Sequence, residues 1–246
     1  MITEIITVFF LTLFVRLWST LAGGGGAVTI PMLLFLGLPP DQAIATNRLS
    51  AFSNVVTLIK FHQQGLVKWR LGFFLALFAG LGAGVGSFFV LVLDSEIIEK
   101  GIGFITLLSV PMFFFRRNLG IVEKSIHISK LRHLGGALIM ASLGIVGGFF
   151  SSTGVWFSYV YLWYYGLSFL QTAATRKISG VAMVLVSLGM FIPAGLVNWP
   201  LGIAMLAGGG IGGWVSAHYS QRLGNGWVRN VFVLVILVSA LKILFF

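Results

Sequence analysis

Long hydrophobic stretches alternate with short polar segments along the whole chain, and this pattern predicts transmembrane helices. Most stretches hold about 20 mainly apolar residues, the length that spans a hydrocarbon core of ~30 Å. The polar segments between them are too short for a soluble domain. The expected segments are 2–22, 27–37, 42–61, 71–93, 97–115, 132–150, 155–165, 169–192, 200–219 and 227–246.

Two of these segments are too short to cross a membrane. Segments 27–37 and 155–165 have about 11 residues each, or about 16 Å of helix. Each follows a run of small residues, at 23–26 in one case and at 151–154 in the other. We therefore predict that each is the returning arm of a broken or re-entrant helix hairpin.

Two motifs occur twice, about 130 residues apart. Residues 37–46 read GLPPDQAIAT and residues 166–175 read GLSFLQTAAT, while GLVKW at 65–69 returns as GLVNW at 195–199. Lys and Arg are retained on the cytoplasmic side of a membrane. The first GLV-W turn is basic and the second carries no charge, so the two copies are predicted to lie upside down to each other, a common construction in secondary transporters. The basic residues around the first turn are Lys60, His62, Lys68 and Arg70.

The remaining loops agree with this inversion. Loops 116–131 and 220–229 are basic and are expected in the cytoplasm, whereas loop 94–99 is acidic and is expected outside. Successive loops fall on alternate sides of the membrane if segment 132–165 enters and leaves the membrane on the same side, as a hairpin does. Each repeat then has three full crossings, and an odd number of crossings inverts the second copy.

We therefore predict an all-α polytopic membrane protein of two inverted-topology repeats, each a broken or re-entrant helix hairpin plus three transmembrane helices. Residues 1–115 form the first repeat, 116–131 a cytoplasmic linker and 132–246 the second, inverted repeat. Both termini are expected outside, and the expected location is the cell inner (plasma) membrane.

Composition agrees with a membrane protein, since 58% of residues are hydrophobic, only 9% are charged and the mean hydropathy is +1.01. The net charge of +10 falls mostly in short loops, which indicates orientation in the membrane rather than binding of nucleic acid. The absence of Cys excludes disulfides and thiolate chemistry. The first stretch lacks the basic start of a signal peptide and is expected to be a retained helix.

The four glycines at 23–26 mark a candidate binding site. Unwound backbone at membrane depth is tolerated only where it is buried in protein or lines a water-filled cavity. The helix that follows directs free N–H groups and its positive end at this point, which suits an anion. Ser151, Ser152 and Thr153 replace the glycines in the second half and offer hydroxyl donors. The alternative interpretation is that the glycines only allow close helix packing.

Polar clusters occur at matching positions near the start of a helix in each half. An ionisable residue in a membrane helix is a functional candidate. One alternative is that the cations of these clusters extend to the membrane–water interface. In the second half, another is that they only follow the positive-inside rule. Arg16, in the first helix, ranks below Arg48 and either lines the route or pairs with Asp41. The clusters are Thr46, Asn47 and Arg48, and Thr175, Arg176 and Lys177.

Several classes of chemistry are missing. The expected helix interiors contain no Asp or Glu, so a proton or sodium relay built on carboxylates is not expected. There is no G-x-S-x-G, H-E-x-x-H or P-loop motif. We expect no enzyme activity, no cofactor and no metal site.

An ordered set of motifs runs through the chain: Gly23-Gly24-Gly25-Gly26 with Pro31, Gly37-Leu38-Pro39, Ala45-Thr46-Asn47-Arg48-Leu49, Gly65-Leu66-Val67-Lys68-Trp69, Ala174-Thr175 and Gly195-Leu196-Val197. By this set the whole chain resembles the sulfite exporter TauE/SafE family, also called the TSUP transporters. The resemblance implies a bacterial inner-membrane transporter that exports sulfite or organosulfonates. The second half departs from the family because it lacks the glycine-rich stretch followed by Pro.

The expected function is secondary transport, by alternating access, of a small sulfur-containing anion such as sulfite or sulfoacetate. The alternatives are a passive anion channel and a membrane subunit or enzyme of sulfur metabolism. The expected partners are the anion and the lipid bilayer, with a monomer or homodimer and no nucleic acid. The substrate-binding candidates are Gly23, Gly24, Gly25, Gly26, Thr46, Asn47, Arg48, Ser151, Ser152, Thr153, Thr175, Arg176 and Lys177.

Overall fold

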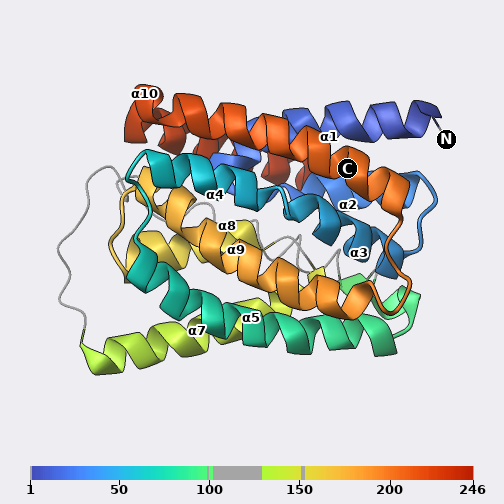
Figure 1. Ribbon diagram of the computed structural model, residues 1–246, viewed down its shortest axis with the longest axis horizontal. Coiled ribbons are helices and arrows are strands. Elements are labelled where there is room, and N and C mark those ends of the chain that lie inside the picture. Colours follow the sequence, from blue (N-terminus) through green and yellow to red (C-terminus); the bar gives the residue numbers. More distant parts are fainter. Residues whose placement is uncertain (1, 99, 102–128, 151–152, 246) are drawn as a thin grey trace.

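The computed structural model describes residues 2–98, 100–101, 129–150 and 153–245, with side chains up to residue 227. The long helices lie side by side along the longest axis of the molecule (Figure 1). In chain order the helices are α1 (Ile2–Ala22), α2 (Gly26–Phe35), α3 (Pro40–Ala51), α4 (Asn54–Gln63), α5 (Trp69–Val92), α7 (Lys130–Phe150), α8 (Gly154–Tyr159), the π-helix η2 (Val160–Tyr164), α9 (Phe169–Phe191) and α10 (Trp199–Phe245).

Five helices within the described residues are long and apolar enough to cross a membrane. On α5, Phe73, Leu77 and Leu81 recur every four residues and are exposed, while Ala79 and Ala83 are buried on the opposite face. Apolar side chains that face outward in a row are expected where a helix contacts lipid. The structure thus confirms the predicted class, an all-α polytopic membrane protein.

Two broken hairpins are the main irregular features of the fold. α1 is followed by α2, and α7 by α8 with η2, and in each pair the short arm returns toward the end where the long arm began (Figure 1). α2 has 10 residues, close to the predicted segment 27–37, and α8 with η2 spans most of the predicted segment 155–165. The lengths of the hydrophobic stretches therefore located both short arms.

The segment predicted at 42–61 is two helices, and the expectation of one continuous helix was wrong. α3 ends at Ala51 and α4 begins at Asn54. Between them the N–H of Ser53 donates to the carbonyl of Ser50 at 3.1 Å, a bond that tightens the turn. Ser and Asn side chains compete with the helix for backbone groups, which favours a break here.

The segments predicted at 200–219 and 227–246 are the two helical parts of α10, which are separated by the non-helical Gly224. Gly224 has φ +75° and ψ 172°, a backbone conformation that residues with a side chain rarely adopt. Two other expectations cannot be placed, because residues 102–115 of one predicted segment and 116–128 of the predicted linker lie outside the described residues.

The two halves of the chain pack crosswise. α1 packs most extensively on α10, and α7 packs most extensively on α5. Glycines permit this close approach, since a Cβ at Gly82 or Gly86 of α5 would overlap a carbonyl oxygen of α7. Each long hairpin arm thus packs on a long helix of the other half.

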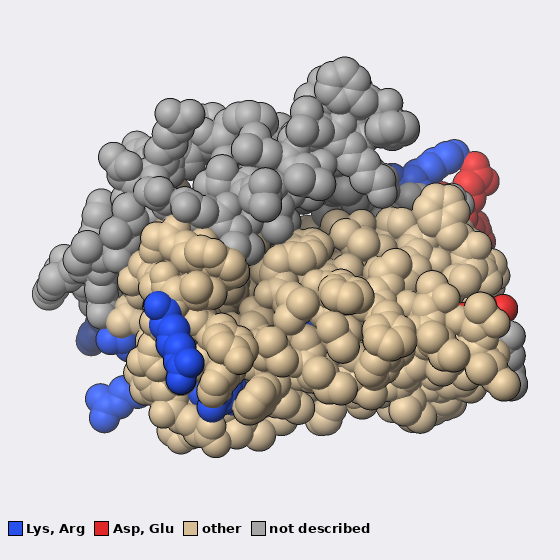
Figure 2. Space-filling model, turned by 90° about the horizontal axis from the view of Figure 1, so that it is seen from above, with Lys and Arg blue, Asp and Glu red and all other residues tan. Residues whose placement is uncertain are grey.

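The two GLV-W turns lie at opposite ends of the molecule, as Figure 1 shows for the α4–α5 and α9–α10 connections. Figure 2 shows Lys and Arg side chains gathered mainly at the end of the α4–α5 turn, and Asp and Glu side chains at the other end. An inverted repeat requires this placement. The duplication and its boundaries remain a prediction.

Candidate functional site

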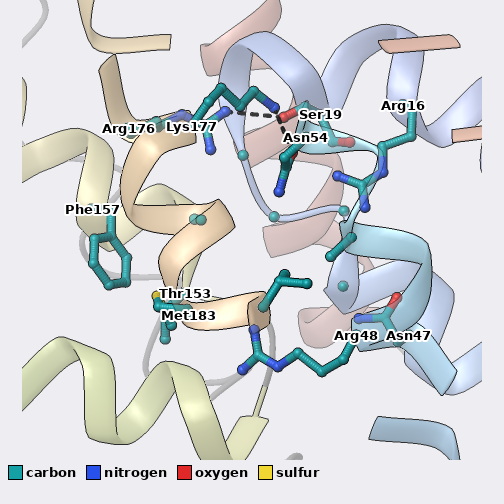
Figure 3. A pocket seen from close by; sticks show the side chains of 18 residues that line it. Arg16, Ser19, Asn47, Arg48, Asn54, Thr153, Phe157, Arg176, Lys177 and Met183 are labelled. Carbon is teal, nitrogen blue, oxygen red and sulfur yellow. Dashed lines mark hydrogen bonds between the residues drawn. The ribbon is translucent and has the colours of Figure 1, made fainter. Parts of the chain in front are cut away.

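A cavity of about 100 Å³ lies where the two hairpin breaks meet α3, α4 and α9. Figure 3 shows polar side chains entering it from several helices. It is enclosed by main chain, by cations and by a few apolar side chains. The lining residues are Arg16, Ser19, Gly23, Gly24, Gly25, Gly26, Asn47, Arg48, Ala51, Asn54, Thr153, Gly154, Phe157, Arg176, Lys177, Gly180, Met183 and Val184.

The glycine run forms one wall of the cavity. Gly23 and Gly24 have φ of +92° and +77°, and this left-handed backbone ends α1. A Cβ on Gly23 would lie 2.7 Å from the carbonyl carbon of Gly154, so the breaks of the two hairpins touch. The amides of Gly24, Gly25 and Gly26 donate no hydrogen bond to a described residue. They are donors at the start of α2, where the helix dipole is positive.

Three cations are almost entirely buried around the cavity, since Arg48 is 5%, Arg176 9% and Lys177 3% exposed. Their hydrogen-bond partners among the described residues are all neutral. Arg48 donates to the Gly147 carbonyl, and Lys177 Nζ donates to Asn54 Oδ1 at 3.1 Å. A buried ion usually has an ionised partner, because desolvation costs several kcal/mol. None of the described residues that line this cavity carries a carboxylate.

The two buried arginines also hold the hairpins in place. Arg176 donates from Nη2 to the carbonyls of Thr20 and Ser19 at 2.8 and 3.2 Å, near the end of α1. Arg48 makes the matching contact near the end of α7. A helix C-terminus carries partial negative charge, so these contacts offset part of each positive charge. The Nε atoms of both arginines remain buried without a partner among the described residues.

Arg16 also lines the cavity, although the sequence ranked it below Arg48. Its guanidinium makes no hydrogen bond or ion pair within the described part of the chain. Arg16 and Lys177 extend toward Asn54 from different sides (Figure 3). The suggested pairing with Asp41 is not seen, and Asp41 Oδ1 is buried without a described partner.

The structure brings together most of the candidates chosen from the sequence. Gly23 to Gly26, Asn47, Arg48, Thr153, Arg176 and Lys177 all line the cavity. Thr46 and Thr175 do not, because each hydroxyl accepts a hydrogen bond from the N–H of a turn residue, Asn198 and Lys68 respectively. Ser151 and Ser152 lie outside the described residues. Contact of any of these residues with substrate remains a prediction.

Sequence reasoning missed two polar residues of the cavity. Ser19 precedes the glycine run by one turn, and its Oγ is buried without a described partner. Asn54 begins α4 and holds Lys177. The available signal was a polar side chain inside a hydrophobic stretch.

The donor set defines what this cavity can hold. Arg16, Arg48, Arg176 and Lys177 face it together with free amides and the Ser19 hydroxyl. Across the described residues no group of three or more His, Cys, Asp or Glu side chains is placed to bind a metal. Cations and N–H donors around a small polar space are suited to an oxyanion.

Comparison with known proteins gives the family. Relatives include a probable membrane transporter protein of Haemophilus influenzae, 29% identical over 92% of this chain and 89% of that protein. The probable membrane transporter protein YfcA of Escherichia coli is 24% identical over 96% of this chain and 88% of its own length. No solved structure matches the chain. Both names describe membrane transporters. Residues 8–243 match the family described as Sulfite exporter TauE/SafE, and the chain belongs to that family.

Proposed function

We propose that this membrane transporter exports a small sulfur oxyanion, sulfite or an organosulfonate such as sulfoacetate, across the bacterial inner membrane by alternating access. One observation carries the proposal: four cations surround a cavity to which no described residue contributes a carboxylate. An anion in the cavity offsets the unfavourable burial of these charges. The basic end of the molecule is assigned to the cytoplasm by the positive-inside rule.

The size of the cavity supports a small substrate. Sites for drug-sized ligands have about 300–1,000 Å³, and this one has about 100 Å³. Sulfite and short sulfonates present oxygen atoms that accept from guanidinium, ammonium and amide donors. The outward direction and the sulfur chemistry are inferred from the family to which the chain belongs.

The first prediction concerns Lys177 and Arg16, the two cations that extend toward Asn54. Lys177→Gln and Arg16→Gln should each lower sulfite flux in reconstituted liposomes about tenfold to a hundredfold, because a charge-assisted hydrogen bond is lost. The matched control is Lys100→Gln, which changes an exposed lysine that pairs with Glu96 and should leave flux unchanged. Wild-type flux in both cavity variants would refute the proposed site.

Alternating access needs its own measurement. A carrier that returns through an anion-loaded state accelerates uptake of labelled sulfite when unlabelled sulfite is trapped inside the vesicles. A continuous pore shows no such counterflow. Equal uptake with and without trapped sulfite would argue for a channel.

A further inference from the structure

Two threonines make reciprocal hydrogen bonds between the two halves of the chain. Thr46 of α3 accepts from the N–H of Asn198 at 3.0 Å, and Thr175 of α9 accepts from the N–H of Lys68 at 3.1 Å. Both threonine side chains are fully buried. In each case the donor directly precedes the Trp that begins a long helix, α10 or α5. The repeated sequence motifs therefore form two equivalent contacts in the structure.

A glycine extends each contact by one helical turn. A Cβ on Gly72 of α5 would overlap Ile178 Cδ1, and a Cβ on Gly202 of α10 would lie 2.7 Å from Leu49 Cδ2. Ile178 and Leu49 follow the two threonines by three residues, so they lie on the same helix face. We call the contact of Thr175 and Ile178 with Lys68 and Gly72 the basic-end latch. The uncharged-end latch is Thr46 with Leu49 against Asn198 with Gly202.

The latches lie on either side of the cavity. Their turns are at opposite ends of the molecule (Figure 1). On both helices a cavity cation, Arg48 or Lys177, follows the latch threonine by two residues. Two residues correspond to about 200° of rotation around a helix, so the threonine faces the turn while the cation faces the cavity. Movement of either helix against its turn therefore also moves a cation.

We infer that the two latches are the gates of the transport cycle and open one at a time. Opening the basic-end latch gives access to the cavity from the cytoplasm, and opening the uncharged-end latch gives access from outside. This inference rests on the proposed transport function. One neutral hydrogen bond changes an equilibrium by only about fivefold, so a latch opens thermally and still biases the two states.

Cysteine labelling tests the gates without any substrate, because the natural chain contains no Cys. Ala51→Cys places one thiol in the cavity lining, and a membrane-impermeant thiol reagent is added to one face of oriented vesicles. Thr175→Val should raise labelling from the basic face about fivefold and lower labelling from the opposite face. Thr46→Val should do the reverse, while Thr175→Ser and Thr46→Ser retain the hydroxyl and should label like the parent.

The opposite signs exclude a general loss of stability, which would change both faces in the same way. Gly72→Ala should reproduce the effect of Thr175→Val, and Gly202→Ala that of Thr46→Val, which provides a second route if a threonine variant folds poorly. If labelling from a given face changed in the same direction in both valine variants, or did not change in either, the assignment of the latches as gates would be wrong. If wild-type protein moves no sulfite but the opposite shifts persist, the proposed substrate fails and the gates stand.

Discussion

Gly23 meets two separate constraints at one residue. Its φ of +92° lies where residues with a side chain are rarely found. In addition, a Cβ would lie 2.7 Å from a backbone carbon of the other hairpin. A neighbouring side chain can rotate away from a clash, but backbone cannot. Residue 23 is therefore restricted to glycine by its own conformation and by its neighbour.

Gly37 is subject to only the first of these constraints, because its φ is +84° but, apart from its chain neighbours, no described residue has an atom within 4 Å of its Cβ position. Gly37→Ala should lower the free energy of unfolding by only about 1 kcal/mol, the strain of a left-handed alanine. Gly23→Ala should lower it by more than about 2 kcal/mol and abolish sulfite flux. Thermal unfolding in detergent and liposome flux measure both effects. Equal destabilisation by the two changes would show that contact between the hairpins is unimportant.

The sequence located the charged residues of the cavity better than the polar ones, for a physical reason. A buried charge in a hydrophobic helix is costly and rare, so Arg48, Arg176 and Lys177 were conspicuous. A threonine is inexpensive to bury, and its position in a helix does not reveal which neighbour it faces. Thr46 and Thr175 were recognised as a repeated pair, but their role required the packing of α3 and α9 to be known.

At the level of helices, glycine decides how closely α5 and α7 approach. Gly82 and Gly86 of α5 face carbonyl oxygens of α7, and Gly144 and Gly148 of α7 face backbone of α5. Without a hydrophobic driving force in lipid, such helices associate mainly through close packing and interhelical hydrogen bonds. This pair should therefore be sensitive to the smallest added side chain.

The effect can be measured by comparing two helical glycines. A Cβ on Gly86 would overlap the carbonyl oxygen of Ile145, whereas Gly189 of α9 has open space around its Cβ position. Gly86→Ala should lower the midpoint of thermal unfolding in detergent. Gly189→Ala should leave it unchanged or raise the free energy of unfolding by up to about 1 kcal/mol, because alanine favours the helix. A stable Gly86→Ala variant would contradict the close packing of α5 and α7.

The lengths of the hydrophobic stretches predicted the helices well where a run of small residues interrupts the chain. They did not predict the break between two helices inside 42–61. Both hairpin arms stood out because a glycine or serine run divides a stretch that is otherwise long enough to cross. The break between α3 and α4 falls within a stretch of ordinary length, so nothing in its hydropathy marks it. Ser53 and Asn54 were the available signal.

For the whole molecule, the imbalance of charge at the centre is the property most closely tied to function. Among the residues that the structure describes, four cations face the cavity and no carboxylate does. A single negative charge leaves most of this imbalance in place, and two negative charges reduce it further. Figure 3 shows Arg48 entering apart from Arg16 and Lys177, so a ligand with two anionic groups can contact both sets.

Sulfoacetate and isethionate provide the comparison, because they are similar in size and share a sulfonate but carry two charges and one charge. Sulfoacetate should inhibit sulfite flux at about tenfold lower concentration, since one additional charge-assisted contact is made. In Lys177→Gln protein the difference between the two inhibitors should shrink. Equal inhibition of wild-type protein would mean that the number of charges does not determine recognition.

The crosswise packing of the halves has a consequence for how the protein is made. α1 leaves the ribosome before α10, yet its main contact is with α10, which is synthesised some 180 residues later. Until α10 is inserted, the face of α1 that packs on α10 lacks this neighbour. A chain interrupted before that point therefore leaves α1 without its main packing partner.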